Sequence, residues 1–338
     1  MRGRVTLGQS GIMVQQNGIM TALDPSHPVD CDFTFVSHAH VDHLHRRGRK
    51  KIRTQLLASK ETTLIAHARG YEIVDASEEQ DGLQLVDTGH ILGSRGLLMG
   101  DDVYYTGDIS VRERAFMKPA KVPHARTLII ESTFGRPEYV FPPLSEVTHR
   151  TNKIISEMYD LGIPVILMGY ALGKAQLLTR LFGHWDPIMH NSVAKINSVY
   201  SELGVKLPGD MTHKQAEEQG LLSKSKPWVM VAPLMSERNA FVREMKDRYG
   251  AVTIGFSGWG VGGRYKYMMG LDYVIPLSDH CDYRELVEAV KQCNPETVYT
   301  FHGFAKEFAE SLQEMGFDAD PIGHHRKAEK TVSLDLFR

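Results

Sequence analysis

The sequence predicts an α/β protein, and three observations support this. Through the first third of the chain, short apolar segments such as residues 33–36 and 83–86 alternate with polar turns, which is typical of strands. After residue 144, helical patterns alternate with strands, as in 144–161 followed by 165–168. The 338 residues are 42% apolar and 24% charged, a composition typical of globular proteins of one large or two ordinary domains.

The expected elements follow one another in a simple order. We expect strands at residues 11–14, 33–36, 83–86, 96–99, 103–105 and 127–130, a helix over 144–161, a strand over 165–168 and a helix that opens at Gly173. The polar segment 210–226 is expected at the surface, before strands at 228–231 and 252–256. After four glycines between residues 258 and 263, we expect a strand over 273–277, a helix from about Tyr283, a strand over 297–301 and a helix from about Ala305.

Charge and cysteine content narrow the class. A net charge of −2 argues against nucleic-acid binding over the whole surface, although a local basic groove remains compatible with it. The three cysteines are too scattered for a disulfide framework or a cysteine-rich zinc module, so a reducing compartment is expected. Because the chain lacks a membrane-length apolar run and its first residues lack the apolar core of a signal peptide, we expect a cytoplasmic protein.

The richest group of candidate ligands is the run from Ser37 to His43, directly after a predicted strand. Side chains two apart share a face of an extended segment, so His38 and His40 can converge on one metal ion. Asp42 and His43 then offer a carboxylate and an imidazole to a neighbouring ion. A solvated polar turn is the alternative, but these donors suit zinc better.

Two further motifs supply the remaining donors. His90 and Asp108 each follow a glycine at the end of a predicted strand, where either residue alone would also suit an ordinary turn. One ion would take His38, His40 and His90, and the other would take Asp42, His43 and a third imidazole. Asp108 could bridge the two, because a carboxylate has an oxygen for each ion.

With these motifs the chain resembles the metallo-β-lactamase superfamily, and within it the β-CASP nuclease branch. Residues 38–43 match the superfamily's signature loop, and Asp24 matches an early buried aspartate that supports that loop. Glu131, His280 and His302 match the three β-CASP motifs, with His302 following His280 by 22 residues (302 − 280). The resemblance implies that His302 is the last ligand of the second zinc, that Asp42 belongs to the catalytic as well as the metal-binding residues, and that His280 paired with Glu131 protonates the leaving group.

The resemblance also implies the architecture. We expect a four-layer αββα metallo-β-lactamase fold built from residues 1–143 and 273–338. A smaller α/β β-CASP domain, residues 144–272, would interrupt it. The active site would lie in the cleft between the two, which admits a single strand or an end more readily than intact duplex.

Two classes within this branch share further motifs with the chain. It resembles the DNA-ligase-associated exonucleases in residues 170–176, 257–259, 277–280 and 300–303. It is also similar to archaeal RNA-processing-exonuclease-like proteins, and a histidine at the position of His302 accompanies RNA substrates in the wider branch. The substrate therefore stays open between DNA and RNA.

The chemistry can be argued from the residues themselves. A phosphodiester repels hydroxide and has a poor leaving group, and two zinc ions lower the pKa of a bridging water and neutralise developing charge. Manganese or iron could occupy the same donors. His280 suits the transfer of a proton to the departing 3′ oxygen, and Glu131 would fix its tautomer. Without the metal cluster, both would pass for ordinary polar residues.

Substrate contacts are expected at three residues and one basic run. Lys174 opens a helix and could hold a phosphate, Ser257 could bind another phosphate, and Trp259 could stack under a base. The alternatives are a solvated lysine and a core tryptophan. The basic residues within 45–51 could line a nucleic-acid track or form a solvated face.

The leading hypothesis is a zinc-dependent nuclease, an exonuclease on single-stranded or end-frayed DNA that acts in repair with a DNA ligase or another repair partner. The second is an RNA 3′-end-processing or decay ribonuclease with the same site. A non-catalytic nucleic-acid-binding scaffold and a β-lactam or thioester hydrolase rank below these. The complete ligand set argues against the scaffold, and the inserted domain argues against the small-molecule hydrolase.

Overall fold

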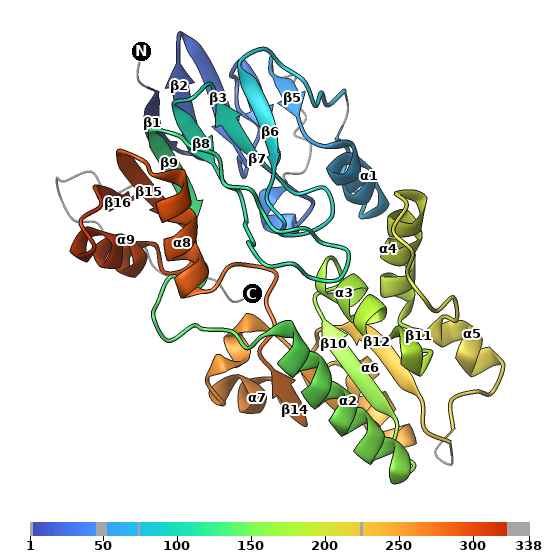
Figure 1. Ribbon diagram of the computed structural model, residues 1–338. Helices are drawn as coiled ribbons and strands as arrows, with labels where there is room; N and C mark the ends of the chain where they lie inside the picture. Colours follow the sequence, from blue (N-terminus) through green and yellow to red (C-terminus); the bar gives the residue numbers. More distant parts are fainter. Residues whose placement is uncertain (1–2, 45–52, 74, 224–225, 323–338) are drawn as a thin grey trace.

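The computed structural model describes residues 3–44, 53–73, 75–223 and 226–322, and three sheets organise them (Figure 1). The first sheet has the order β1-β2-β3-β4-β5. Its strands are β1 (Arg4–Gly8), β2 (Gly11–Gln16), β3 (Ile19–Leu23), β4 (Phe33–Phe35) and β5 (Gln55–Leu57). β1, β2 and β3 pair antiparallel, and β4 lies parallel between β3 and β5.

The second sheet has six strands in the order β16-β15-β9-β8-β7-β6. They are β6 (Leu83–Asp87), β7 (Arg95–Met99), β8 (Val103–Tyr105), β9 (Thr127–Glu131), β15 (Thr297–Phe301) and β16 (Ala319–Pro321). The parallel register of β15 on β9 sets Phe301 opposite Glu131. The residues that follow these two strands therefore emerge at the same edge of the sheet.

The two sheets face each other across one apolar core. Phe35 of the first sheet and Leu97 and Ile129 of the second are fully buried in a shared cluster. Helices α8 (Tyr283–Cys293) and α9 (Ala305–Glu314) cover the other face of the six-stranded sheet. On the side of the five-stranded sheet, α1 (Lys60–Ala68) packs beside β5. The predicted α/β fold, two facing sheets with helices outside, is confirmed.

A parallel five-stranded sheet with the order β11-β12-β10-β13-β14 forms the lower half of the molecule in Figure 1. Its strands are β10 (Val165–Gly169), β11 (Ile188–Met189), β12 (Val229–Pro233), β13 (Val252–Phe256) and β14 (Tyr273–Ile275). Around them lie α2 (Leu144–Asp160), α3 (Lys174–Leu181), α4 (Asn191–Glu202), α5 (His213–Glu218), α6 (Ala240–Tyr249) and α7 (Arg264–Met269), with short 3₁₀ turns η2 (Gly183–Trp185) and η3 (Gly258–Val261).

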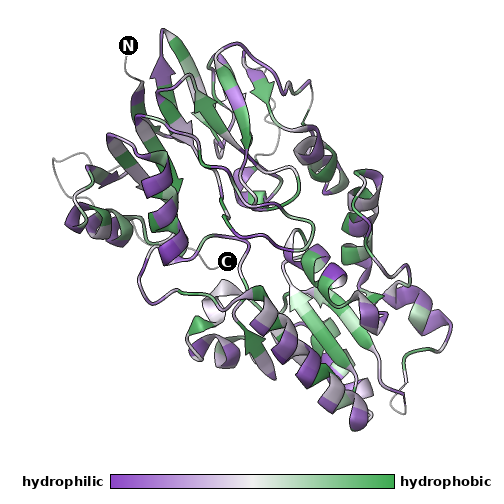
Figure 2. Ribbon diagram, in the orientation of Figure 1, coloured by the Kyte–Doolittle hydropathy of each residue, from purple (hydrophilic) through white to green (hydrophobic). Residues whose placement is uncertain are grey.

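The apolar runs of the inserted strands reflect burial on both faces, which is usual in parallel sheets. Residues Val165 and Leu167 of β10 point into one hydrophobic cluster, while Ile166 and Met168 point into another. Figure 2 shows these strands in green, between helices that also carry hydrophilic residues.

One expectation needs correction. The insertion does not end at residue 272, because β14 pairs in parallel with β13 and so belongs to the inserted sheet. The described part of the segment 210–226 lies largely at the surface, as expected, although α5 within it buries Ala216. None of the described helices is long and apolar enough to span a bilayer.

Candidate metal centre

The histidine run begins where β4 ends and continues into a 3₁₀ turn, η1 (Val41–His43). His38 and His43 are buried, and His40 is partly exposed. The preceding strand has no exposed residue, so these imidazoles follow directly from the core, and His40 reaches the carbonyl oxygen of Leu172 beyond the two facing sheets.

His90 and Asp108 reach the same place from the second sheet. His90 follows β6 through Gly89, whose φ of +68° suits glycine. A Cβ at that position would lie 2.5 Å from the carbonyl oxygen of Ser110, so glycine is also required for space. Asp108 follows β8 and is only 4% exposed.

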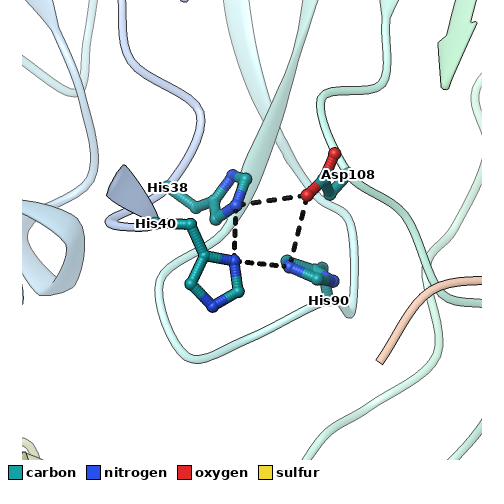
Figure 3. A group of neighbouring side chains, drawn as sticks. All are labelled: His38, His40, His90 and Asp108. Atoms are coloured by element: carbon teal, nitrogen blue, oxygen red, sulfur yellow. Dashed lines mark hydrogen bonds and ion pairs between the residues drawn. The ribbon is translucent and has the colours of Figure 1, made fainter. Parts of the chain in front are cut away.

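The first candidate group consists of His38, His40, His90 and Asp108 (Figure 3). The Nδ1 atom of His40 lies 3.0 Å from His38 Nε2 and 3.1 Å from His90 Nε2. Asp108 Oδ2 lies 3.3 Å from His38 Nε2 and 3.5 Å from His90 Nε2. Four potential ligand atoms thus lie close enough together to bind one ion.

In His40 and His90, the ring nitrogen that faces away from the other ligand atoms shows which nitrogen carries the proton. His40 Nε2 lies 3.3 Å from the carbonyl oxygen of Leu172, and His90 Nδ1 lies 3.0 Å from that of Asp279. A carbonyl only accepts, so each of these nitrogens donates, and the facing nitrogen keeps its lone pair. Burial lowers the pKa of His40 to about 3 and that of His90 well below its ordinary value, so both rings are neutral at pH 7. Lone pairs that face one another without a proton fit a cation.

The second candidate group consists of Asp42, His43 and His302. His43 Nε2 lies 3.7 Å from Asp42 Oδ2 and 3.5 Å from Asp108 Oδ1. Both His43 Nε2 and Asp108 Oδ1 are buried atoms without a hydrogen-bond partner among the described residues, as expected of atoms that bind a cation. Asp108 therefore turns one oxygen toward each group, which suits a bridging carboxylate.

Asp24 orients the second group through hydrogen bonds to Ser37 and His43. Its carboxylate accepts from the Ser37 amide at 2.7 Å, from the Ser37 hydroxyl at 2.5 Å and from His43 Nδ1 at 2.7 Å. The Tyr105 hydroxyl also donates to it, at 2.8 Å. Burial lowers the pKa of His43, but the carboxylates of Asp108 and Asp24 outweigh this and raise it to about 10. The carboxylates around His43 therefore favour positive charge at this position, which a bound cation would supply in place of a proton.

Glu131 and His280 lie beside Asp108. Glu131 ends β9 and is fully buried, and its Oε1 lies 2.8 Å from His280 Nδ1. The Ile109 amide donates to the same oxygen at 3.0 Å. Burial lowers the pKa of His280, yet Glu131 and Asp108 reverse the effect and raise it to about 9. Its imidazole is partly exposed and is therefore accessible for proton transfer.

The three expected substrate residues differ in accessibility. Lys174 is neither a solvated lysine nor exposed enough to reach a phosphate. Its side chain is 2% exposed, and its ammonium lies 3.1 Å from Asp279 Oδ1. Burial lowers the pKa of Lys174 to about 8, although Asp279 opposes the shift. Ser257 is buried and caps η3 by accepting from the Trp259 amide. Trp259 is 36% exposed and is the one of the three that offers a surface. The basic run within 45–51 lies outside the described residues.

Sequence reasoning missed two buried charges near the site. Arg114 donates to Asp279 Oδ1 at 3.0 Å and to the His90 carbonyl oxygen at 3.1 Å. In the sequence, only the position of Asp279 directly before His280 indicates that these two charges lie near the site.

The chain is similar to several known proteins. Residues 265–320 match the family model described as "Zn-dependent metallo-hydrolase RNA specificity domain". The chain is 36% identical over 312 residues to a "Probable DNA ligase" of Opitutus terrae, covering 88% of this chain and 29% of that protein. It is 23% identical over 398 residues to "Cleavage and polyadenylation specificity factor 73" of Drosophila melanogaster, covering 91% of this chain and 58% of that one.

By these matches the chain is similar to the metallo-β-lactamase superfamily, in its β-CASP branch. It spans less than two thirds of the length of both relatives. A crystal structure of a protein of unknown function from Enterococcus faecalis shares the fold, with a TM-score of 0.62 at 14% identity over 89% of this chain and 93% of that one. The match to a zinc-dependent hydrolase domain thus accompanies a site in which imidazole lone pairs converge near Asp108 Oδ1, a buried oxygen without a hydrogen-bond partner among the described residues.

Proposed function

We propose that this chain is a nuclease that holds two zinc ions and hydrolyses phosphodiester bonds, with DNA as the leading substrate and exonucleolytic action. The observation that carries the proposal is the Glu131–His280 pair beside Asp108, the carboxylate that faces both candidate groups. A hydrolase of activated small esters has no need of a separate acid, whereas an alkoxide leaving group does.

In the proposed site, one ion belongs to His38, His40 and His90, the other to Asp42, His43 and His302, and Asp108 serves both. Zinc bound there would activate water as the nucleophile and offset the negative charge of the phosphodiester. Manganese or iron could serve the same donors.

The chain itself supplies the proton for the leaving group. Glu131 accepts from His280 Nδ1, which leaves Nε2 as the nitrogen that gives a proton to the departing 3′ oxygen. The buried carboxylate also favours the imidazolium form at neutral pH, because it raises the pKa of His280 to about 9 after burial has lowered it. The Glu131 carboxylate thus favours the protonated form of His280, which is the form that an acid needs.

DNA ranks first because the chain is 36% identical to the "Probable DNA ligase" over 88% of its length, compared with 23% identity over 91% for the Drosophila relative. The same similarity supports a DNA ligase, or a ligase region of a longer protein, as a functional partner in repair. Trp259 is the proposed base contact, since part of its indole is exposed beside the aromatic rings of Phe134 and Tyr139. Ser257 lies behind it in the same turn and would position it.

RNA is the second candidate. It is favoured by the matched family description, which names RNA specificity, and by the printed name of the Drosophila relative. His302, at the third β-CASP position, also points this way.

End-labelled DNA and RNA oligonucleotides of one sequence test the proposal. Wild-type chain and an Asp108→Ala variant are incubated with each, labelled at the 5′ or the 3′ end. We expect a DNA ladder that shortens from one end with wild type and none with the variant. An RNA-only ladder would transfer the assignment to the second candidate. Equal cleavage by both proteins, or none by zinc-loaded wild type, would overturn the nuclease proposal.

A further inference from the structure

Two of the candidate zinc ligands donate a hydrogen bond to residues outside the two facing sheets. The donor is the ring nitrogen that faces away from the candidate group. His40 Nε2 donates to the carbonyl of Leu172, which lies in the inserted domain between β10 and α3. His90 Nδ1 donates to the carbonyl of Asp279, which lies on the return from the inserted domain to α8. We call residues 170–174 the docking loop.

A buried set of charges ties the docking loop to the return segment. Lys174 Nζ and Arg114 Nη1 lie 3.1 and 3.0 Å from Oδ1 of Asp279. All three side chains are at most 6% exposed. Unpaired charges at this depth are strongly unfavourable, so each one constrains the position of the others.

The same arginine fixes the segment that carries His90. Arg114 donates to the carbonyls of Gly89 and His90 and, at 3.3 Å, to that of Ser278. A continuous network of bonds therefore runs from Lys174 in the inserted domain to a ligand of the first candidate group.

The docking loop has no room to shift toward the sandwich. Leu172 is 2% exposed and belongs to the same apolar cluster as Ala39 and Ile91, the neighbours of His40 and His90. Gly173 has a φ of +84°, and a Cβ there would collide with Ile91 Cγ2. Its amide also donates to Gln176 Oε1 at 2.8 Å.

We propose that the docking loop and Asp279 set the zinc affinity of the first group by orienting His40 and His90, so that cation binding and docking of the inserted domain are coupled. Outer hydrogen bonds fix the tautomer and ring orientation of a ligating histidine. Coupling of this kind is reciprocal, so a bound cation would also hold the inserted domain in place. The inference rests on the proposed metal centre and is independent of nuclease activity.

Gly173→Ala is the most direct perturbation, because it forces the docking loop off Ile91 without changing a ligand. Gly204→Ala is its matched control: Gly204 lies in the same domain with a φ of +86°, and a Cβ added there would have no neighbour within 4 Å among the described residues. Both positions have a similar positive φ, +84° and +86°. Lys174→Met is the second test variant, which removes the ion pair and leaves the backbone unstrained.

The measurement is zinc affinity of the full chain, stripped with a chelator and titrated against a chromophoric competitor, with the cobalt d–d spectrum as a second readout. We expect wild type and Gly204→Ala to bind two ions alike. Gly173→Ala and Lys174→Met should hold one ion roughly 10–100-fold more weakly and keep the other. Cobalt spectra should change in the same two variants.

Folded Gly173→Ala and Lys174→Met proteins that bind both ions as wild type does would overturn the inference and leave the metal centre standing. A lowered melting temperature with unchanged zinc affinity would count against it in the same way. If Gly173→Ala fails to fold by circular dichroism, Lys174→Met decides the question. Wild type that binds no zinc would overturn both this inference and the proposed function.

Discussion

His280 Nδ1 lies 2.8 Å from Oε1 of Glu131, a carboxylate that is fully buried at the end of β9. The two residues are 149 positions apart, and the inserted domain lies between them. β9 and the segment before α8 bring them together next to Asp108, whose Oδ2 lies 3.9 Å from His280 Nδ1. A proton donor is thus held at the edge of the candidate metal centre.

Replacing His280 by Asn should lower kcat by about 10²–10⁴-fold, the usual contribution of a positioned acid. Zinc content should stay at the wild-type level, because His280 belongs to neither ion's proposed ligand set. Single-turnover cleavage and elemental analysis of the same preparation check both points. His149→Asn, on the exposed face of α2, is the control. A wild-type rate for His280→Asn would remove its assigned role.

The pH profile should report the same group. An acid with a raised pKa is protonated below that value, so activity should fall as the pH rises through it. Burial lowers the pKa of His280, whereas the Glu131 carboxylate raises it, to about 9 overall. Bound cations would lower the pKa of His280 from that value. Glu131→Gln removes the carboxylate and should shift the alkaline limb to lower pH by roughly one to three units. Profiles of kcat/KM from pH 6 to 10 would contradict this if the limb stayed in place.

Trp259→Ala should weaken binding of single strands by roughly 1–3 kcal/mol for one stacked base. The effect should appear in KM more than in kcat, because the ring partners of Trp259 are Phe134, Tyr139 and Phe304 and none of the proposed ligands. Fluorescence anisotropy with a labelled oligonucleotide measures it. Tyr267→Ala, which removes an aromatic ring that is 81% exposed on α7, serves as the control. Equal affinities for both variants would show that Trp259 is only a packing residue.

Asp24 should matter for stability as well as for metal retention. It accepts four hydrogen bonds in a buried position, so Asp24→Asn should lower the unfolding free energy of the metal-free chain by about 3–5 kcal/mol. Asp32→Asn, an exposed aspartate that accepts from the Met20 amide, should change it by less than about 0.5 kcal/mol. Urea denaturation in the presence of a chelator compares the two. Similar losses would refute the supporting role of Asp24.

Much of this fold follows from local patterns. The strands that carry ligands are short apolar runs that end in Gly-His, Gly-Asp or the histidine run, and these signals do not depend on the rest of the chain. Lys174 shows the limit of such reasoning. A lysine after a glycine at a helix start looks solvated, and only the packing of α3 on the return segment buries it against Asp279.

Arg114 and β14 depend on tertiary structure in the same way. Nothing near Arg114 in the sequence marks it as buried, since its partners lie about 25 residues before it and 165 after it. β14 follows a helix and precedes the return, so its sheet is decided by pairing with β13 and not by its own composition.

The most direct test of the whole account is the metal content of the purified chain, measured by elemental analysis beside Asp108→Ala. Wild type should hold two zinc ions, and loss of the carboxylate that faces both groups should release at least one of them. A wild-type chain that binds no divalent metal, or an Asp108→Ala variant that keeps both ions at full affinity, would contradict it.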